Sequence, residues 1–276
     1  MRKFNYLLGV VLIGSVLLSG IHSAQAMESD YYYDGMKPAT KQIAYPIVKS
    51  YPNSKTFMKA IPNRYTKYAA IGRIANKNGW AGPEYETMGS GFVIDDHTIL
   101  TNAHVIDDEH GKATAPKYLT FEMNRNEADI PHKFAVTKVV KVPYADVALV
   151  HTKVKLTDYV KPMKLATDNQ IARLKQGQVL FSVGYPFDGK IYEKRYFNRA
   201  LFIMRTANQT EFVMKDKFRA GASGSPLFDS KMRVYGLRTY GYDLYGEYDT
   251  PYAKAEYSGA EALYGYTGQY VLDHMY

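Results

Sequence analysis

The chain has 276 residues, a formal net charge of +8 and no cysteine. The absence of cysteine excludes disulfides, thiol catalysis and cysteine-based zinc sites, so stability must come from packing. Residues 27–80 are strongly basic and residues 240–276 are acidic, and this distribution is not the continuous basic stripe of a nucleic-acid-binding protein.

The first 26 residues have the pattern of a signal peptide. Arg2 and Lys3 precede an apolar run from Leu7 to Leu18, and Ala24-Gln25-Ala26 fits a small-x-small cleavage site. The apolar run is short for a membrane span, although an uncleaved N-terminal anchor is the alternative. We therefore expect a secreted, extracellular protein without a membrane span.

Residues 27–60 differ in composition from the rest of the chain. Tyr31-Tyr32-Tyr33 is followed by polar residues and by Pro38, Pro46 and Pro52, and neither a helical nor a strand period persists. This pattern predicts an extended leader. It is either a propeptide, which would make the chain a zymogen, or an arm that stays and packs on the body.

Short β-type segments separated by turns begin near Tyr65. The predicted strands are Tyr68–Ile74, Gly91–Ile94, Thr98–Asn102, Phe134–Val142, Val147–Thr152, Val179–Tyr185, Arg199–Arg205, Glu211–Lys215, Pro226–Phe228 and Arg233–Thr239. Helical patterns are rare, with one candidate at Asp168–Leu174 and a short closing turn near Tyr270–Met275. Many short strands predict an all-β barrel or sandwich.

Three local sequences could carry chemistry. His104 follows a β-branched strand that ends in Ala103, Asp146 begins the apolar segment Val147–Val150, and Ser223 lies between small residues in a tight Gly-rich turn. Their order is His, Asp, Ser, with separations of 42 and 77 residues. This is the chain order of the chymotrypsin class, in which His is the general base, Asp orients it and Ser attacks the carbonyl.

Four segments make the resemblance specific: Thr101–Val105, Asp146–Val150, Gly184–Asp188 and Gly221–Pro226. The chain resembles the staphylococcal glutamyl endopeptidase family, which includes the exfoliative toxins and the Spl proteases. The similarity runs from about Tyr65 to Arg238 and resumes at Gly265–Met275. It implies a chymotrypsin-like double β-barrel with a short C-terminal helix, a protease domain over residues 61–276, and a catalytic cleft between the barrels.

The resemblance also implies an oxyanion hole formed by the backbone N–H groups of Gly221 and Ser223. One departure is Ala222, where relatives carry Asn and trypsin-like enzymes carry Asp. Ala222 cannot pair with a new N-terminus, so activation of a zymogen would need another route. Ala222 also lacks the side-chain hydrogen bond that would steady the Ser loop, which predicts reduced activity as an alternative.

Specificity is expected from residues near the nucleophile. In the family, a His on the strand after the Ser loop binds an acidic P1 side chain, and Arg238 stands there in this chain. Lys217, Phe218 and Arg219 precede the Ser loop, so we expect a cationic pocket and cleavage after Glu or Asp. Alternatively, these charges face solvent or are neutralised by Asp216 and Glu211.

Residues Thr239, Tyr240 and Gly241 are expected to pair with substrate backbone by β-augmentation. The segment that follows, 240–270, is rich in Tyr and Gly, including Tyr242, Tyr245, Tyr248, Tyr252, Tyr257, Tyr264 and Tyr266. We expect an enlarged surface loop, with a recognition loop as the alternative.

Other functions fit less well. The cluster from His104 to His110 lacks the spacing of a helical zinc motif, so no metal and no cofactor are expected. A quality-control protease would need a following PDZ domain, and an α/β-hydrolase would need His last in order. The remaining alternative is an inactive protease fold that binds partners through its Tyr-rich region. The expected partner is a protein or peptide substrate, and the expected state is a monomer.

Overall fold

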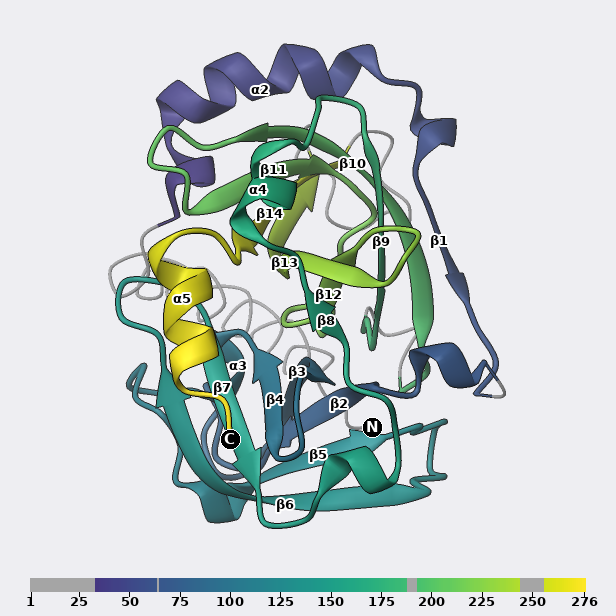
Figure 1. Cartoon of the computed structure of the whole chain (residues 1–276), viewed down its shortest axis with the longest axis vertical. Helices are drawn as coiled ribbons and strands as arrows, with labels where there is room; N and C mark the ends of the chain where they lie inside the picture. Colours follow the sequence, from purple (N-terminus) through teal and green to yellow (C-terminus); the bar gives the residue numbers. More distant parts are fainter. Residues whose placement is uncertain (1–32, 64, 188–192, 244–255) are drawn as a thin grey trace, which may run out of the picture.

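The computed structural model describes residues 33–63, 65–187, 193–243 and 256–276. The predicted signal peptide, Asp188 and the tyrosines at 245, 248 and 252 lie outside the described residues. Two β-barrels are stacked along the long axis of the molecule (Figure 1), as the resemblance implied.

The first barrel is a closed ring of six strands in the order β2-β3-β4-β7-β6-β5. Its strands are β2 (Ile71–Asn76), β3 (Thr87–Val93), β4 (Thr98–Thr101), β5 (Leu119–Met123), β6 (His132–Lys141) and β7 (Ala148–Thr152). The predicted hairpin at 91–102 is present, because β3 pairs with β4 antiparallel from Phe92 and Leu100 onward. The ring closes where β2 pairs with β5.

The second barrel closes in the order β10-β11-β14-β13-β12-β9, because β9 also pairs with β10. Its strands are β9 (Val179–Gly184), β10 (Tyr196–Arg205), β11 (Glu211–Lys215), β12 (Pro226–Phe228), β13 (Arg233–Asp243) and β14 (Glu256–Ala262). Two short strands extend it: β1 (Phe57–Ala60) pairs with β10, and β8 (Lys164–Leu165) pairs with β13. The all-β fold class is therefore confirmed.

Apolar side chains fill both barrels. Phe92 and Phe121 are buried in the first barrel and Phe212 and Leu227 in the second, all within one continuous cluster of buried residues. Strands such as β7 and β11 are buried along their whole length, which is why they appear in the sequence as apolar runs rather than as alternating patterns.

In the two barrels helices are few and short, as predicted. They are α3 (Ala103–Ile106), α4 (Asp168–Ala172) and α5 (Tyr266–Asp273). The described residues also contain 3-10 turns at Asp34–Met36 (η1), Asn53–Lys55 (η2), Thr66–Tyr68 (η3), Pro116–Tyr118 (η4) and Leu156–Asp158 (η5). A capping box between Thr167 and Gln170 starts α4. After α5 the chain reaches the first barrel, where the ring of Tyr276 packs edge-on against His151.

The extended conformation predicted for the leader is wrong for residues Pro38–Ser50, which form helix α2. Pro38 occupies the first turn, where a missing N–H costs nothing. Ala44 and Val48 pack against the second barrel, and the buried Lys215 ammonium donates to the carbonyls of Val48 and Tyr51 at the helix end. Tertiary contacts therefore stabilise this helix, although Pro46 in its interior argues against a helix when the sequence is taken alone.

Helix α2 lies across the end of the second barrel that faces away from the first (Figure 1). Within the part of the chain described, none of the helices is long and apolar enough to cross a membrane.

Candidate active site

His104 and Asp146 are joined by two hydrogen bonds in the first barrel. The backbone N–H of His104 donates to Asp146 Oδ1 at 2.8 Å, and His104 Nδ1 lies 2.5 Å from Asp146 Oδ2. His104 sits on the short helix α3 directly after β4, and Asp146 lies in the tight turn between β6 and β7. The arrangement fixes the imidazole ring and leaves Nε2 as the nitrogen available for proton transfer.

The carboxyl group of Asp146 is completely buried. Burial alone would raise its pKa, but the charge of His104 and hydrogen bonds from His104 and Tyr33 outweigh burial and lower the pKa below its ordinary value. Asp146 is therefore ionised at neutral pH and can stabilise a protonated His104.

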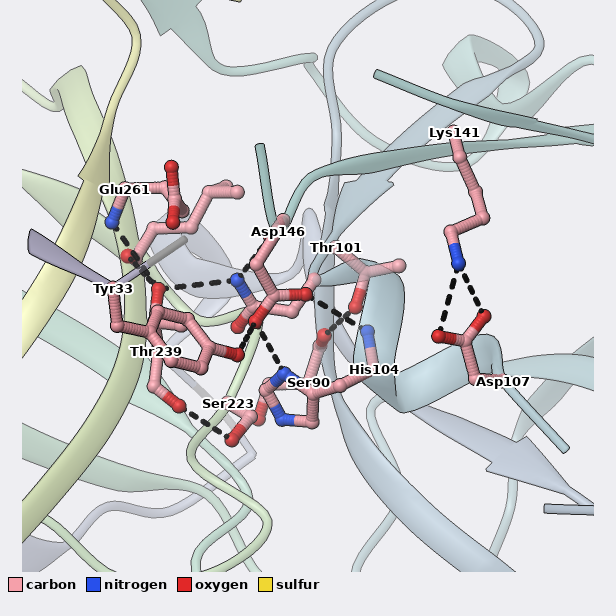
Figure 2. A network of polar contacts seen from close by, with 12 residues as sticks. Tyr33, Ser90, Thr101, His104, Asp107, Lys141, Asp146, Ser223, Thr239 and Glu261 are labelled. Carbon is pink, nitrogen blue, oxygen red and sulfur yellow. Dashed lines mark hydrogen bonds and ion pairs between the residues drawn. The ribbon is translucent and has the colours of Figure 1, made fainter. Parts of the chain in front are cut away.

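Ser223 approaches this pair from the second barrel (Figure 2). Ser90, on β3, holds the serine loop in place: its N–H donates to Ser223 O at 2.7 Å and its hydroxyl to Gly221 O at 2.8 Å. Asn102 connects the two halves behind the site, because its amide donates to Asp146 O and to Thr239 Oγ1. The three residues predicted as a triad are thus brought together across the barrel interface.

The conformation of the serine loop requires glycine at two positions. Gly221 has φ +76° and Gly224 has φ +82°, and an added Cβ would lie 2.4 Å from Tyr185 O at Gly221 and 2.1 Å from Ser90 O at Gly224. Within the described residues, neither the Gly221 N–H nor the Ser223 N–H donates to a backbone carbonyl. Both donors are thus available for a developing oxyanion.

The hydroxyl of Ser223 donates to the carbonyl of Thr239 at 3.1 Å. A hydroxyl has a single proton to donate, so in this arrangement His104 does not receive it. Proton transfer to His104 requires the hydroxyl hydrogen of Ser223 to turn away from Thr239 O.

Tyr33 is a residue of the site that sequence reasoning missed. Its hydroxyl donates to Asp146 Oδ2 at 2.6 Å, and its ring packs edge-on against Tyr240. It lies in the segment expected to be a leader, 113 residues from its partner. Only its place in a tyrosine cluster distinguished it in the sequence, because nothing local indicates a contact across that distance.

A second group of carboxylates lies beside Tyr33. Glu211 accepts hydrogen bonds from the backbone of Asp34 and Gly35 and, at 2.6 Å, from the hydroxyl of Tyr240. Burial raises the pKa of Glu211 to about 7. Burial and the nearby charges of Glu211 and Asp146 also raise the pKa of Glu261. Tyr240 therefore points inward, toward Glu211.

The two arginines predicted to line the P1 pocket are ion-paired. Arg238 is almost fully buried, and its guanidinium contacts both oxygens of Asp216 at 2.5 and 2.7 Å. Arg219 lies 2.8 Å from Glu256, whose pKa is raised to about 7 by burial despite that guanidinium. Asp216 thus neutralises Arg238, as one sequence alternative held, whereas Glu211 pairs with neither arginine in the ion pairs of the described residues.

The predicted pocket has two walls, residues 217–219 and strand residues 238–241, and Phe218 brings them into contact. Its ring lies over the Arg238 guanidinium, and its Cβ would be 2.4 Å from a Cβ added to Gly241. Lys217 belongs to the same wall, and its carbonyl accepts from Arg238 at 2.9 Å. The predicted pocket residues are therefore neighbours in space, with Phe218 against Gly241 and Arg238.

The acidic residues after His104, considered above as a possible metal cluster, include one that forms an ion pair with a lysine. Asp107 contacts the Lys141 ammonium at 2.9 Å, as Figure 2 also shows. Across the described ranges, His, Asp and Glu side chains do not gather into a group of three or more that could hold a metal ion.

Comparisons of the sequence with known proteins find staphylococcal relatives. The chain is 28% identical over 169 residues to exfoliative toxin A of Staphylococcus aureus, covering 56% of each chain. It is 25% identical over 183 residues to a glutamyl endopeptidase of Staphylococcus epidermidis, covering 61% of this chain and 57% of the relative. The chain thus spans less than two thirds of the length of these relatives.

Two solved structures share the fold. The structure of Glu endopeptidase in complex with MPD has a TM-score of 0.60 at 15% identity and covers 78% of this chain and 95% of its own. The scabies mite inactivated protease paralogue S-D1 has a TM-score of 0.58 at 14% identity, and the match covers 78% of this chain and 93% of that structure's chain. At these identities the similarity concerns the fold alone.

The model of the trypsin-like peptidase domain matches residues 89–237, more than half of the chain. The chain therefore belongs to the family of trypsin-like, chymotrypsin-fold peptidases.

Proposed function

We propose that the protein is a secreted serine endopeptidase with Ser223 as nucleophile, His104 as general base and Asp146 as the residue that orients His104. The observation that carries this proposal is the double hydrogen bond between His104 and Asp146 in one barrel, facing a serine on a glycine-rich turn of the other. This is the arrangement that activates a hydroxyl for acyl transfer.

The proposed reaction has two steps. Ser223 Oγ attacks the scissile carbonyl while its proton moves to His104 Nε2, and the oxyanion accepts hydrogen bonds from the N–H groups of Gly221 and Ser223. His104 then gives the proton to the leaving amine, and the C–N bond breaks to leave an acyl-enzyme. A water molecule, deprotonated by His104, attacks the ester, and its proton returns to Ser223 Oγ.

Substrate backbone is proposed to pair with Thr239, Tyr240 and Gly241. Strand β12 pairs with β13 only as far as Leu237, while β14 occupies the opposite edge of β13 beyond that point. The edge of β13 next to Ser223 is thus not paired with β12 at these three residues, which suits an added strand.

A preference for Glu or Asp at P1 remains a prediction. A carboxylate entering beside Arg238 would have to compete with Asp216, and one beside Arg219 with Glu256. Profiling a peptide library varied at P1 tests it, and cleavage after large apolar or basic residues would contradict it.

Segment 33–60 is proposed to be an arm that stays on the mature protein. Tyr33 completes the hydrogen bonding of Asp146, and β1 and α2 pack on the second barrel. Signal-peptide cleavage after Ala26 would retain all three. Mass spectrometry of the secreted, active protein should therefore find an N-terminus before Tyr33, and a start after residue 60 would contradict this.

Labelling with a fluorophosphonate probe tests the nucleophile. We expect the wild type to be labelled, and Ser223→Ala and His104→Ala not to be, while the circular dichroism of all three agrees. A folded wild type that takes no label and cleaves no peptide would refute the proposal. That result would favour the alternative, a protease fold that only binds its partners.

A further inference from the structure

A large cavity opens beside the catalytic pair, on the side away from the predicted P1 pocket. It has a volume of about 650 Å³, and His104, Gly221 and Ser223 form part of its lining. Neither the 217–219 wall nor strand residues 238–241 are among the residues that line it. A cavity of this size lies within the range of about 300–1,000 Å³ typical of binding sites.

Three large aromatic side chains line the cavity. Trp80, Tyr85 and Phe187 line it with 54%, 65% and 47% of their surfaces exposed, and Met88 adds a flexible thioether. Three large rings exposed within one concavity are unusual, because exposed apolar residues are ordinarily scattered. Aromatic walls next to a reacting centre favour apolar side chains of a ligand.

The charged residues at the end of the cavity neutralise one another. Arg73 lies 2.8 Å from Glu86 and 3.0 Å from Glu122, and Arg125 contacts Glu122 and Glu193. Lys133 lies 3.1 Å from Glu122, so three cations face three carboxylates. These groups are already ion-paired and therefore offer no unpaired charge to select an acidic or basic ligand. Shape and apolar contact are left to determine what binds.

The position of the cavity identifies the part of the substrate that would enter it. The acyl half of a peptide is expected along Thr239–Gly241, whereas the amine half leaves past His104, which must protonate it. His104 lines this cavity. We propose that the cavity binds the peptide segment after the scissile bond and selects a large aliphatic or aromatic side chain at its first or second position. This inference rests on the proposed function.

A kinetic test keeps the acyl half of a peptide fixed and varies the two positions after the scissile bond. We expect kcat/KM for Phe, Trp or Leu at one of them to exceed that for Gly or Asp by about tenfold, the discrimination that one apolar pocket supplies. Trp80→Ala should lower the ratio of kcat/KM for the apolar peptide to kcat/KM for the Gly peptide, whereas Trp80→Phe should keep this ratio. Tyr118→Ala, at an exposed tyrosine that does not line the cavity, is the matched control.

A binding test does not depend on activity. Trp80 is the only tryptophan of the chain, so its fluorescence reports on this cavity alone. In Ser223→Ala, peptides with an apolar residue after the scissile bond should change the emission saturably, and their Gly or Asp counterparts should not.

The outcomes separate the two proposals. Labelling by fluorophosphonate together with a flat profile at both positions would overturn the cavity assignment and leave the peptidase intact. A Trp80 response to apolar peptides in a protein that takes no label would support the cavity as a peptide site and overturn the catalytic proposal. Emission that changes with protein concentration alone would mean that a second copy fills the cavity, which also overturns the assignment.

Discussion

The hydroxyl of Tyr33 and Nδ1 of His104 meet at the same oxygen of Asp146, at 2.6 and 2.5 Å (Figure 2). Tyr33 comes from the N-terminal segment and His104 from the first barrel, so this oxygen joins two parts of the chain. Its hydrogen bonds determine how the carboxylate is directed toward the imidazole ring.

Tyr33→Phe removes this hydroxyl and keeps the ring against Tyr240. We expect kcat to fall about tenfold, the effect of one hydrogen bond to a charged group, with KM little changed. The pH at which activity rises should also shift, because the donor helps to set the charge on Asp146. Tyr118→Phe, at an exposed tyrosine, should alter neither quantity, and an unchanged pH profile in Tyr33→Phe would show that Tyr33 only packs.

Gly221→Ala tests the oxyanion hole. The residue has φ +76° and an added Cβ would lie 2.4 Å from a backbone oxygen, so the loop must shift and redirect its N–H. We expect kcat/KM to fall by about 10²–10³, the typical cost of losing one oxyanion donor. Ala222→Gly, a change at the neighbouring position, should retain far more activity. Comparable kinetics for the two variants would contradict the assignment.

Arg238→Gln tests whether that guanidinium serves stability rather than specificity. Asp216 would be left buried without its cation, which costs about 3–5 kcal/mol. Urea denaturation of the variant should show this loss, and Arg238→Gln/Asp216→Asn should recover much of it, because both charges are then gone. If instead the single variant is stable and only its P1 preference changes, Arg238 acts in substrate recognition.

Glu211→Gln tests the raised pKa of the carboxyl group beside the N-terminal segment. The folded pKa is about 7 and the ordinary value 4.5, so the unfolded chain ionises first as the pH rises. The contribution of Glu211 to folding is therefore complete below pH 4.5 and is lost between 4.5 and 7. Since Gln resembles the protonated acid, the decline in unfolding free energy across this window should be smaller in the variant. Measurements in a Ser223→Ala background avoid autolysis, and equal slopes in both proteins would contradict the pKa.

Much of the fold could be predicted because its signals are local. The strand pattern, the hairpin before His104 and the capped helix α4 depend on neighbouring residues, and β11 and β12 have the predicted bounds. The grouping of His104, Asp146 and Ser223 followed from their order along the chain. The ion pair of Arg238 with Asp216 was foreseen only as an alternative, because sequence does not reveal whether a cation meets an acid or a ligand.

Contacts between distant segments could not be predicted. Helix α2 was missed because its prolines suggest a break, and the groups that stabilise it, such as Lys215, lie more than 160 residues away. Tyr33 was missed for the same reason. The aromatic cavity is a further case, since Trp80 and Tyr85 come from the loop between β2 and β3 whereas Phe187 follows β9 in the other barrel.

The separation along the chain between the N-terminal segment and its partners determines when the site can be completed. Gly35 accepts a hydrogen bond from Tyr257, 222 residues later, and the neighbouring contacts of Asp34 are to Glu211. Contacts this distant form slowly, because a long loop must close first. Residues 33–36 are synthesised early but dock only after β14 has been made. The hydrogen bonds that hold residues 33–36 beside Asp146 are therefore complete only once the chain has been synthesised as far as β14.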